Sequence, residues 1–362
     1  MHIPDRIFSK ALKLKPLSAD ELMLLYRFAP TNELMFTANQ LRQMYVRGKG
    51  VSWQIDRNVN ITNVCISGCK FCSFHCKPHE TQKSYTTTFD EYIDKIEELK
   101  KLDGNQLLLQ GGLHPDYGLQ FYVNLFSELK KYYPDIKLHA LGPPEIAHIA
   151  QKEQKSFTEI LEKLIEAGLD SLPGAGAEIL CDRIRKQISP AKPDAQTWLD
   201  VMHEAHKLNL PTSATMVFGH IETLEERIEH LIKIRNLQYK KPRNAYGFLA
   251  FICWPVQLCG TKLGEQIGNK ITTAEDYIRT VAISRIALTN IKNIQASWLT
   301  TGKNIAQIAL HSGANDMGSI MIEENVVAAT GTVNTLDADG IQQAICEAGF
   351  TPWRRNQKYQ RE

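Results

Sequence analysis

The chain has 362 residues, of which 43% are hydrophobic and 23% are charged, and its 42 basic and 40 acidic residues give a formal net charge of +2. This composition is typical of a globular protein with one large domain or two small ones, and the balanced charge gives no argument for a nucleic-acid partner. The chain start lacks a signal-peptide pattern and no apolar run approaches about 18 residues, so we expect a cytoplasmic protein without a membrane partner.

The first 50 residues show the apolar periodicity of amphipathic helices, in 19–26 and again in 34–46. We expect residues 1–50 to form an N-terminal helical extension. Residues 51–362 are then expected to form the main body, with a C-terminal segment packed on it.

Three cysteines stand in the eight residues that follow a predicted strand at 59–64: Cys65, Cys69 and Cys72. A [4Fe–4S] cluster normally takes four protein thiolates, so a compact group of three leaves one iron open to another ligand. Zinc is the alternative, because a tetrahedral zinc site needs a fourth ligand and His75 or Cys76 could supply it.

From about residue 55, short apolar runs alternate with amphipathic stretches, which is the pattern of parallel βα units. The predicted strands lie near residue 60 and at 106–110, 136–140, 169–172, 212–216, 247–252, 293–296 and 314–316. The predicted helices between them lie at 89–102, 120–133, 157–167, 198–208, 224–238 and 274–288. Six strands would make a partial barrel and eight a complete one. We predict an α/β fold with a complete (β/α)8 barrel.

In such a barrel the chemistry lies where the strands end. Gln110, Gly111 and Gly112 end the second predicted strand, and two glycines let the backbone approach a ligand closely. A plain tight turn is the alternative. His139 stands at the end of the third strand, where it could act as a general base or a substrate donor. A histidine that is hydrogen-bonded to a neighbouring loop is the competing interpretation.

Beyond the fourth strand, the glycine-rich segment 173–177 leads to one carboxylate, Glu178. Arg183, Arg185 and Lys192 follow within 14 residues. A planar guanidinium suits carboxylate recognition, so these cations are candidates to bind a ligand carboxylate. The sequence does not separate them.

The segments 212–220 and 247–255 carry small and aromatic residues that predict a mostly apolar pocket wall. Two further titratable groups fall near predicted strand ends. His220, followed by Glu222, comes after the fifth strand, and Asp316 belongs to the last.

The segments taken together resemble the radical S-adenosylmethionine (SAM) superfamily. Five segments carry the likeness: 60–65 with the cysteines that follow, 110–112, 173–180, 214–220 and 315–319. They are similar to a branch of biotin-synthase-like barrels that acts on menaquinone and deazaflavin precursors. The similarity runs from about residue 50 to Tyr359. Within the branch, 294–298 and 321–327 most resemble the enzymes that cyclise dehypoxanthine futalosine in the futalosine route to menaquinone.

The resemblance implies a [4Fe–4S] cluster on the three cysteines, with SAM on its open iron and Cys76 outside the ligand set. The residues implied to contact SAM are Phe71 at the adenine, Gln110, Gly111 and Gly112 at the amino group, Glu178 at the ribose, and Arg183 or Arg185 at the carboxylate. The usual Gly-Gly-Glu motif is incomplete, because its third position is Leu113.

The implied reaction is a ring closure, in which a 5′-deoxyadenosyl radical takes hydrogen from C4′ of the substrate ribose and the carbon radical adds to the benzoate ring. The ring then loses an electron, and a proton goes to a base for which the candidates are His139, His220, Glu178 and Asp316. The implied partners are dehypoxanthine futalosine and an electron donor such as flavodoxin or ferredoxin. The alternatives are a sister enzyme, aminofutalosine synthase or the deazaflavin-forming subunit, and a structural zinc or iron–sulfur protein.

Overall fold

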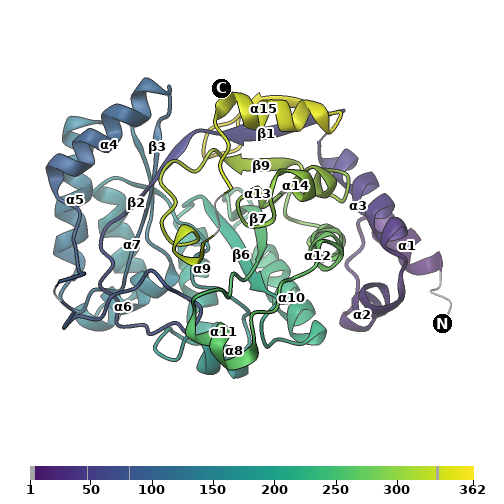
Figure 1. Ribbon diagram of the computed structural model, residues 1–362, viewed down its shortest axis with the longest axis horizontal. Helices are drawn as coiled ribbons and strands as arrows, with labels where there is room; N and C mark the ends of the chain where they lie inside the picture. Colours follow the sequence, from purple (N-terminus) through teal and green to yellow (C-terminus); the bar gives the residue numbers. More distant parts are fainter. Residues whose placement is uncertain (1–4, 47, 81, 332–333) are drawn as a thin grey trace.

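Parallel strands close into a barrel at the centre of the computed structural model (Figure 1), which describes residues 5–46, 48–80, 82–331 and 334–362. Within these residues the barrel has eight strands: β2 (Asp56–Asn60), β3 (Gln106–Gln110), β4 (Lys137–Ala140), β5 (Leu169–Ser171), β6 (Thr212–Phe218), β7 (Phe248–Pro255), β8 (Asn293–Gln295) and β9 (Asp316–Ser319). Parallel bridges from Leu172 to Thr212 and from Arg57 to Ile322 join its two sheets. The predicted α/β barrel is confirmed.

Helices surround the barrel, and several begin at sequence signals that satisfy their first N–H groups. Ser18, Thr88, Ser156 and Thr223 each form a capping box with a glutamate three residues later. The helices after the first barrel strand are α4 (Phe89–Lys101), α5 (Leu119–Tyr132), α6 (Pro143–Glu153), α7 (Phe157–Glu166), α8 (Asp182–Ile188), α9 (Ala195–Lys207), α10 (Leu224–Lys240), α11 (Lys262–Ile267), α12 (Ala274–Ala287), α13 (Trp298–Thr301), α14 (Lys303–Leu310), the 3₁₀ turn η1 (Ala328–Thr330) and α15 (Ala338–Glu347).

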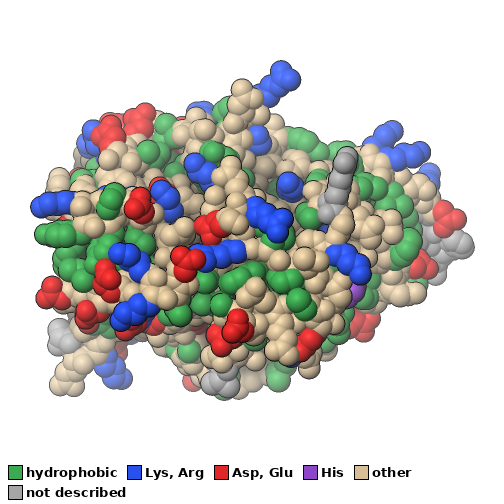
Figure 2. Space-filling model, turned by 90° about the horizontal axis from the view of Figure 1, so that it is seen from above, with side chains coloured by type: hydrophobic (Ala, Val, Ile, Leu, Met, Phe, Trp, Pro, Cys, Tyr) green, Lys and Arg blue, Asp and Glu red, His purple; other side chains and the backbone are tan. Residues whose placement is uncertain are grey.

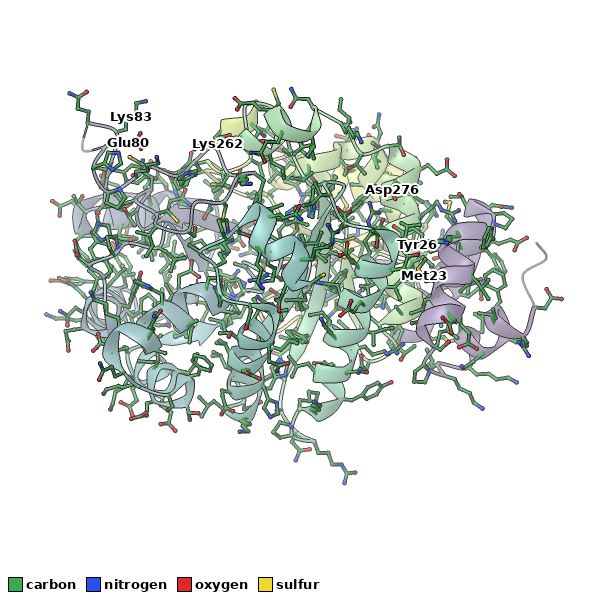
Figure 3. The ribbon with its side chains drawn as sticks, turned by 90° about the horizontal axis from the view of Figure 1, so that it is seen from below. Met23, Tyr26, Glu80, Lys83, Lys262 and Asp276 are labelled. Carbon is green, nitrogen blue, oxygen red and sulfur yellow. The ribbon has the colours of Figure 1, made fainter. Side chains whose placement is uncertain are left out.

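The N-terminal segment forms α1 (Asp5–Leu12), α2 (Ala19–Phe28) and α3 (Thr31–Tyr45) at one end of the molecule (Figure 1). Helix α2 packs on α10 and α12, and α3 packs on α12. Tyr26 of α2 and Asp276 of α12 lie side by side at this boundary (Figure 3), with 3.4 Å between the hydroxyl and carboxylate oxygens. The segment is therefore joined to the outer helices of the barrel.

Two strands were not predicted. β1 (Gly50–Gln54) precedes β2 directly, and β10 (Thr351–Arg354) follows α15. Both pairings of β1, with β9 and with β10, are parallel. Thr351 and Pro352 interrupt the apolar pattern of β10, which is why its short sequence gave no strand signal.

The ends of two predicted strands need correction. The first strand was expected over 59–64, but β2 ends at Asn60, and the Ile61 N–H donates to the Gln110 carbonyl as the chain turns into a loop. The last was expected over 314–316, but β9 begins at Asp316. Asp316 therefore lies at the start of its strand, not at the end where the chemistry was expected.

The outer surface carries charges of both signs. Lysine and arginine side chains alternate with aspartate and glutamate over the face shown in Figure 2. Among the described residues, none of the helices has the length and apolar character needed to cross a lipid bilayer.

Candidate functional site

A cavity of about 360 Å³ runs through the inside of the barrel. Phe71, Gln110 and Glu178 line its mouth, where the strands end, and Asp56, at the start of β2, lines its floor. The apolar part of its wall includes Val217, Leu249, Ile252, Trp254 and Trp298. Small-molecule sites are typically concave, mostly apolar and furnished with a few polar groups, and this cavity has that character.

The loop with the three cysteines lies at the cavity mouth. The Ser67 hydroxyl lies 2.8 Å from the Cys65 sulfur and 3.5 Å from the Cys69 sulfur. The Cys72 N–H donates to the Cys69 carbonyl at 3.3 Å, so a tight turn brings the second and third cysteines together. Burial raises the pKa of the Cys69 thiol to about 11, against the opposing charge of Lys192.

The donor set of this loop fits an iron–sulfur cluster. Among the described residues, no three His, Cys, Asp or Glu side chains converge closely enough to hold one metal ion. A four-iron cluster binds its cysteines on separate irons, so its ligands do not converge on one point. Cys65 and Cys69 both contact Ser67, so their sulfurs lie near each other, and all three cysteines of the loop have free thiols, which are the donors that such a cluster takes.

Backbone contacts from distant segments hold the loop. The Lys70 N–H donates to the Ile188 carbonyl at 2.7 Å, and the Leu263 N–H donates to the Lys70 carbonyl at 2.8 Å. The Ile66 N–H donates to the Leu113 carbonyl at 3.0 Å. The loop is thus fixed by segments that follow β3, β5 and β7, which the barrel brings to one end.

Gly111 and Gly112 pack against this loop. A Cβ atom at Gly112 would lie 2.1 Å from the Val64 carbonyl oxygen and 2.9 Å from the Cys65 Cβ. At Gly111 the nearest atom would be the Thr62 carbonyl oxygen, at 3.0 Å. From the sequence alone, these glycines are expected to let the backbone approach a ligand. In the structure they let the backbone approach the cysteine loop.

The two candidates for a fourth zinc ligand are engaged locally. The Cys76 thiol donates to the Glu80 carbonyl at 3.3 Å and contacts the Lys77 carbonyl at 3.5 Å. A ring nitrogen of His75, Nδ1, lies 2.9 Å from the Cys72 carbonyl oxygen. The Cys76 backbone pairs with Asn63 and Cys65, so its contribution here is to the shape of the loop.

Glu178 is a buried carboxylate held by two cations. Its oxygens lie 2.7 Å from the Lys192 Nζ and 3.4 Å from an Arg185 nitrogen. Burial alone would raise the pKa of Glu178, but Lys192 and Arg185 lower it below its usual value. Its backbone φ is +41°, a conformation that non-glycine residues adopt rarely and that often marks a functional site.

Lys192 and Arg185 differ in the groups that they contact besides Glu178. The Arg185 guanidinium donates to the carbonyls of Gly176 and Ala177 before α8 and of Pro193 after it, so backbone groups on both sides of α8 hold it. Lys192 lies with its Nζ 5.7 Å from the centre of the Phe71 ring. Lys192 is therefore the cation that joins Glu178 to the cysteine loop.

His139 lies inside the barrel, within β4. Its Nδ1 lies 2.7 Å from the Ser171 hydroxyl oxygen, and the residue lines the cavity. Burial lowers the pKa of His139 to about 4, with a further contribution from the positive charge of Arg355. The imidazole is therefore neutral near pH 7 and retains a lone pair.

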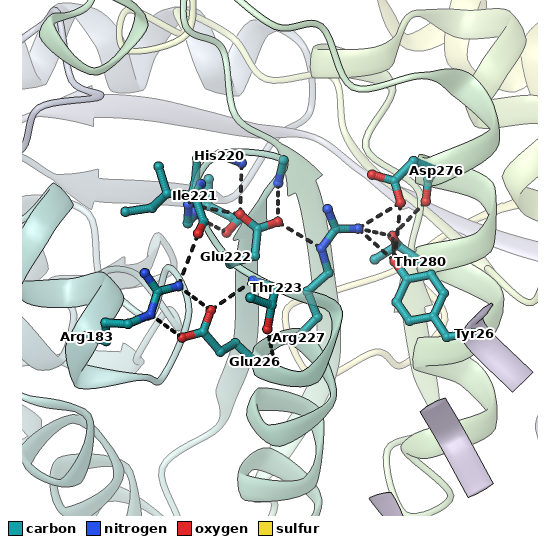
Figure 4. A network of polar contacts seen from close by, with 12 residues as sticks. Tyr26, Arg183, His220, Ile221, Glu222, Thr223, Glu226, Arg227, Asp276 and Thr280 are labelled. Carbon is teal, nitrogen blue, oxygen red and sulfur yellow. Dashed lines mark hydrogen bonds and ion pairs between the residues drawn. The ribbon is translucent and has the colours of Figure 1, made fainter. Parts of the chain in front are cut away.

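His220 and Arg183, two further candidates, belong to a network at the edge of the barrel (Figure 4). The His220 ring contacts the Val217 carbonyl at 3.1 Å and the Glu222 carboxylate at 3.0 Å. Arg183 forms two hydrogen bonds with Glu226, at 2.8 and 2.6 Å. These contacts favour structural roles for both side chains.

Arg227 connects this network to the N-terminal helices. Its guanidinium donates to Glu222 at 2.8 Å, to Asp276 at 2.8 Å and to the Tyr26 hydroxyl at 2.7 Å (Figure 4). The loop that carries His220 is thereby tied to α2 and α12.

Asp316 is fully buried behind the cavity wall, where the C-terminal tail contacts it, and it does not line the cavity itself. Its carboxylate accepts a hydrogen bond from Arg355 Nε at 2.6 Å and one from the Ser52 hydroxyl at 2.5 Å. The Tyr359 ring centre is 3.9 Å from the Arg355 guanidinium carbon. Arg355 and Tyr359 line the cavity together with Gln357. These tail residues were not predicted as site residues; the only signal for them in the sequence is that the resemblance extends to Tyr359.

The segment 321–327, singled out by the sequence analysis, forms part of the cavity wall. Four of its residues line the cavity: Met321, Glu324, Val326 and Val327. Glu323 points elsewhere and pairs with Arg57 at 2.7 Å. The Asn325 amide nitrogen donates to the Asn60 side chain at 3.1 Å. The segment is thus anchored to β2 while it presents other side chains to the cavity.

Family models match most of the chain. Residues 59–234 match the model of the radical SAM superfamily, and residues 245–362 match a model described as the CofH/MqnC C-terminal region. The first match covers the cysteine loop and Glu178, and the second covers the segment 321–327 and the tail.

Relatives and a solved structure agree with these matches. The chain is 40% identical to cyclic dehypoxanthine futalosine synthase of Streptomyces coelicolor, over 95% of this chain and 85% of the relative. It is 36% identical to 5-amino-6-(D-ribitylamino)uracil–L-tyrosine 4-hydroxyphenyl transferase 1 of Methanosarcina barkeri, over 99% of this chain and 93% of the relative. The crystal structure of methylornithine synthase superposes with a TM-score of 0.72 at 16% identity, over 97% and 98% of the two chains, and shows the same fold.

Proposed function

Because this chain belongs to the radical SAM superfamily and carries the C-terminal region of its futalosine and deazaflavin branch, we propose that it cyclises dehypoxanthine futalosine in menaquinone biosynthesis. The proposed reaction removes the hydrogen from C4′ of the substrate ribose and joins that carbon to the benzoate ring. The observation that carries the proposal is that 321–327, the segment with the closest likeness to these cyclases, lines the cavity.

The family implies a [4Fe–4S] cluster and SAM. When bound, they would supply the 5′-deoxyadenosyl radical and a place for the electron that the ring loses at the end. We assign the cluster to Cys65, Cys69 and Cys72. Phe71, which lines the cavity mouth beside them, would pack on the adenine.

The cavity supplies the positions that the ring closure needs. An apolar wall suits the benzoate ring and keeps water away from a radical, which then has one reaction partner. His139, neutral near pH 7, is our candidate to accept the proton that the ring loses.

The proposal is tested by product analysis. The reconstituted protein, incubated with SAM, dithionite and dehypoxanthine futalosine deuterated at C4′, should release a cyclised product. Deuterium should appear in 5′-deoxyadenosine, because that radical takes the C4′ hydrogen. Mass spectrometry of both products checks the two steps separately. An unlabelled 5′-deoxyadenosine would contradict the proposed site of attack.

The transferase reaction of the Methanosarcina relative is the second candidate, because the chain is 36% identical to it over 363 residues. A parallel incubation with tyrosine and 5-amino-6-(D-ribitylamino)uracil separates the two. Product from this pair, and none from dehypoxanthine futalosine, would assign the chain to the transferase.

Glu178→Gln is expected to weaken SAM binding more than cluster assembly. The carboxylate would accept hydrogen bonds from ribose hydroxyls, and a bond of this kind contributes about 1.5–3 kcal/mol. The expected rise in the SAM dissociation constant is therefore about tenfold to a hundredfold. Equilibrium binding of SAM to the reconstituted variant checks it.

Arg183→Gln is the matched control for this measurement. Arg183 was a candidate for the SAM carboxylate, but it is half-exposed and paired with Glu226. We expect its SAM affinity to stay at the wild-type value. An unchanged affinity in Glu178→Gln, or a loss in Arg183→Gln equal to that of Glu178→Gln, would remove the ribose role from Glu178.

A further inference from the structure

The C-terminal tail reaches the proposed base through one intervening hydroxyl. Gln357 lines the cavity floor, and the Ser171 hydroxyl donates to its side-chain oxygen Oε1 at 3.2 Å. The same Ser171 oxygen lies 2.7 Å from His139 Nδ1. Residues 139, 171 and 357, which are far apart in the sequence, thus form one chain of hydrogen bonds.

The donors and acceptors in this series of hydrogen bonds determine which ring nitrogen of His139 carries the proton. An amide oxygen only accepts, so the single hydroxyl proton of Ser171 goes to Gln357. The Ser171 oxygen must then accept its second bond, which comes from His139 Nδ1–H. A neutral imidazole carries one proton, so Nε2 of His139 holds the lone pair.

We propose that Gln357 is a positioning residue that, through Ser171, holds the proton of His139 on Nδ1 and leaves Nε2 free to accept a proton from the cyclised substrate. This inference rests on the proposed function. The cyclised radical breaks one C–H bond, its proton goes to Nε2, and its remaining electron goes to a one-electron acceptor of the oxidised iron–sulfur class. Aromaticity returns, and the imidazolium later releases the proton to solvent.

Two substitutions at one position test the proposal. Gln357→Leu leaves the Ser171 proton without its acceptor, so Ser171 donates to Nδ1 and the imidazole proton moves to Nε2. We expect the ratio of cyclised product to 5′-deoxyadenosine to fall by about 100-fold or more, the range of a general base, while deuterium transfer from C4′ continues. Gln357→Glu still only accepts, so its ratio at pH 7 should stay close to the wild-type ratio.

The pH dependence adds a readout that a structural role would not change. The charged and titratable groups that line the cavity with His139 are Asp56, Glu178, Glu324, Arg355 and Tyr359. Because the pKa of His139 is lowered to about 4, the wild-type ratio should be constant from neutral pH down to about pH 5. A carboxylate at position 357 favours the imidazolium, so in Gln357→Glu the fall on the acid side should begin at a higher pH.

The tautomer is also measurable without turnover. Long-range ¹H–¹⁵N spectra of histidine-labelled protein, with the His139 signal assigned through His139→Gln, should show Nδ1–H in the wild type and Nε2–H in Gln357→Leu. Gln360→Leu is the control, since this tail residue bonds to Asn356 and is exposed. Its ratio of cyclised product to 5′-deoxyadenosine and its His139 tautomer should both match the wild type.

Three results would overturn the positioning role: a wild-type ratio in Gln357→Leu, an equal loss in Gln357→Leu and Gln357→Glu, or an unchanged tautomer. Failure of the proposed function is distinguishable from these. A wild-type protein that forms no cyclised product contradicts the ring closure, whereas the tautomer measurement still decides the role of Gln357.

Discussion

Replacing Cys65, Cys69 or Cys72 by alanine is expected to abolish cluster-dependent cleavage of SAM. Three thiolates must hold the cluster, so each loss leaves an iron without its protein ligand. Cys76→Ala should retain cleavage, because the Cys76 thiol forms a local hydrogen bond with the Glu80 carbonyl. Iron and sulfide content after anaerobic reconstitution, with 5′-deoxyadenosine formed under dithionite, measures both effects.

The same measurement separates the enzyme from a structural metal protein. About four irons per chain are expected in Cys76→Ala and in the wild type. One zinc per chain, lost in Cys76→Ala or in a matching change at His75, would support the zinc alternative instead. Loss of the cluster in Cys76→Ala together with its retention in any variant of the triplet would show that the ligand assignment is wrong.

Gly112→Ala is expected to remove most of the bound iron while the barrel remains folded. The new Cβ would lie 2.1 Å from the Val64 carbonyl oxygen, so the backbone next to Cys65 must shift. Overpacking of this kind typically costs about 1–3 kcal/mol. Here the displaced atoms are the backbone of the proposed ligand loop, so we expect the substitution to impair cluster assembly more than folding of the barrel. Iron content and a thermal melt of the same sample measure loading and folding separately.

Gly111→Ala provides the graded control. Its Cβ would lie 3.0 Å from the Thr62 carbonyl oxygen, a contact that a shift of a few tenths of an ångström relieves. We expect it to retain most of its iron. Equal loading in the two variants would mean that close backbone packing behind the loop is not needed for assembly.

The sequence predicted the features that depend on neighbours along the chain. The alternation of apolar runs and amphipathic stretches located six of the eight barrel strands closely and displaced the first and the last, because the periods of 2 and 3.6 residues are local properties. The spacing of Cys65, Cys69 and Cys72 within one loop predicted a cluster for the same reason. The same local signal placed His139 near the end of the third strand, where β4 carries it.

The tertiary structure decided which distant segments meet. Lys192, rather than Arg183, joins Glu178 to the cysteine loop, because Arg183 is bound by Glu226 of α10. Asp316 is connected to the cavity only through Arg355, which returns to it from the C-terminal tail and lines the cavity. The bond from Ser171 to Gln357 spans 186 residues. No local period carries such information, since these contacts arise only when barrel closure brings strand ends and tail together.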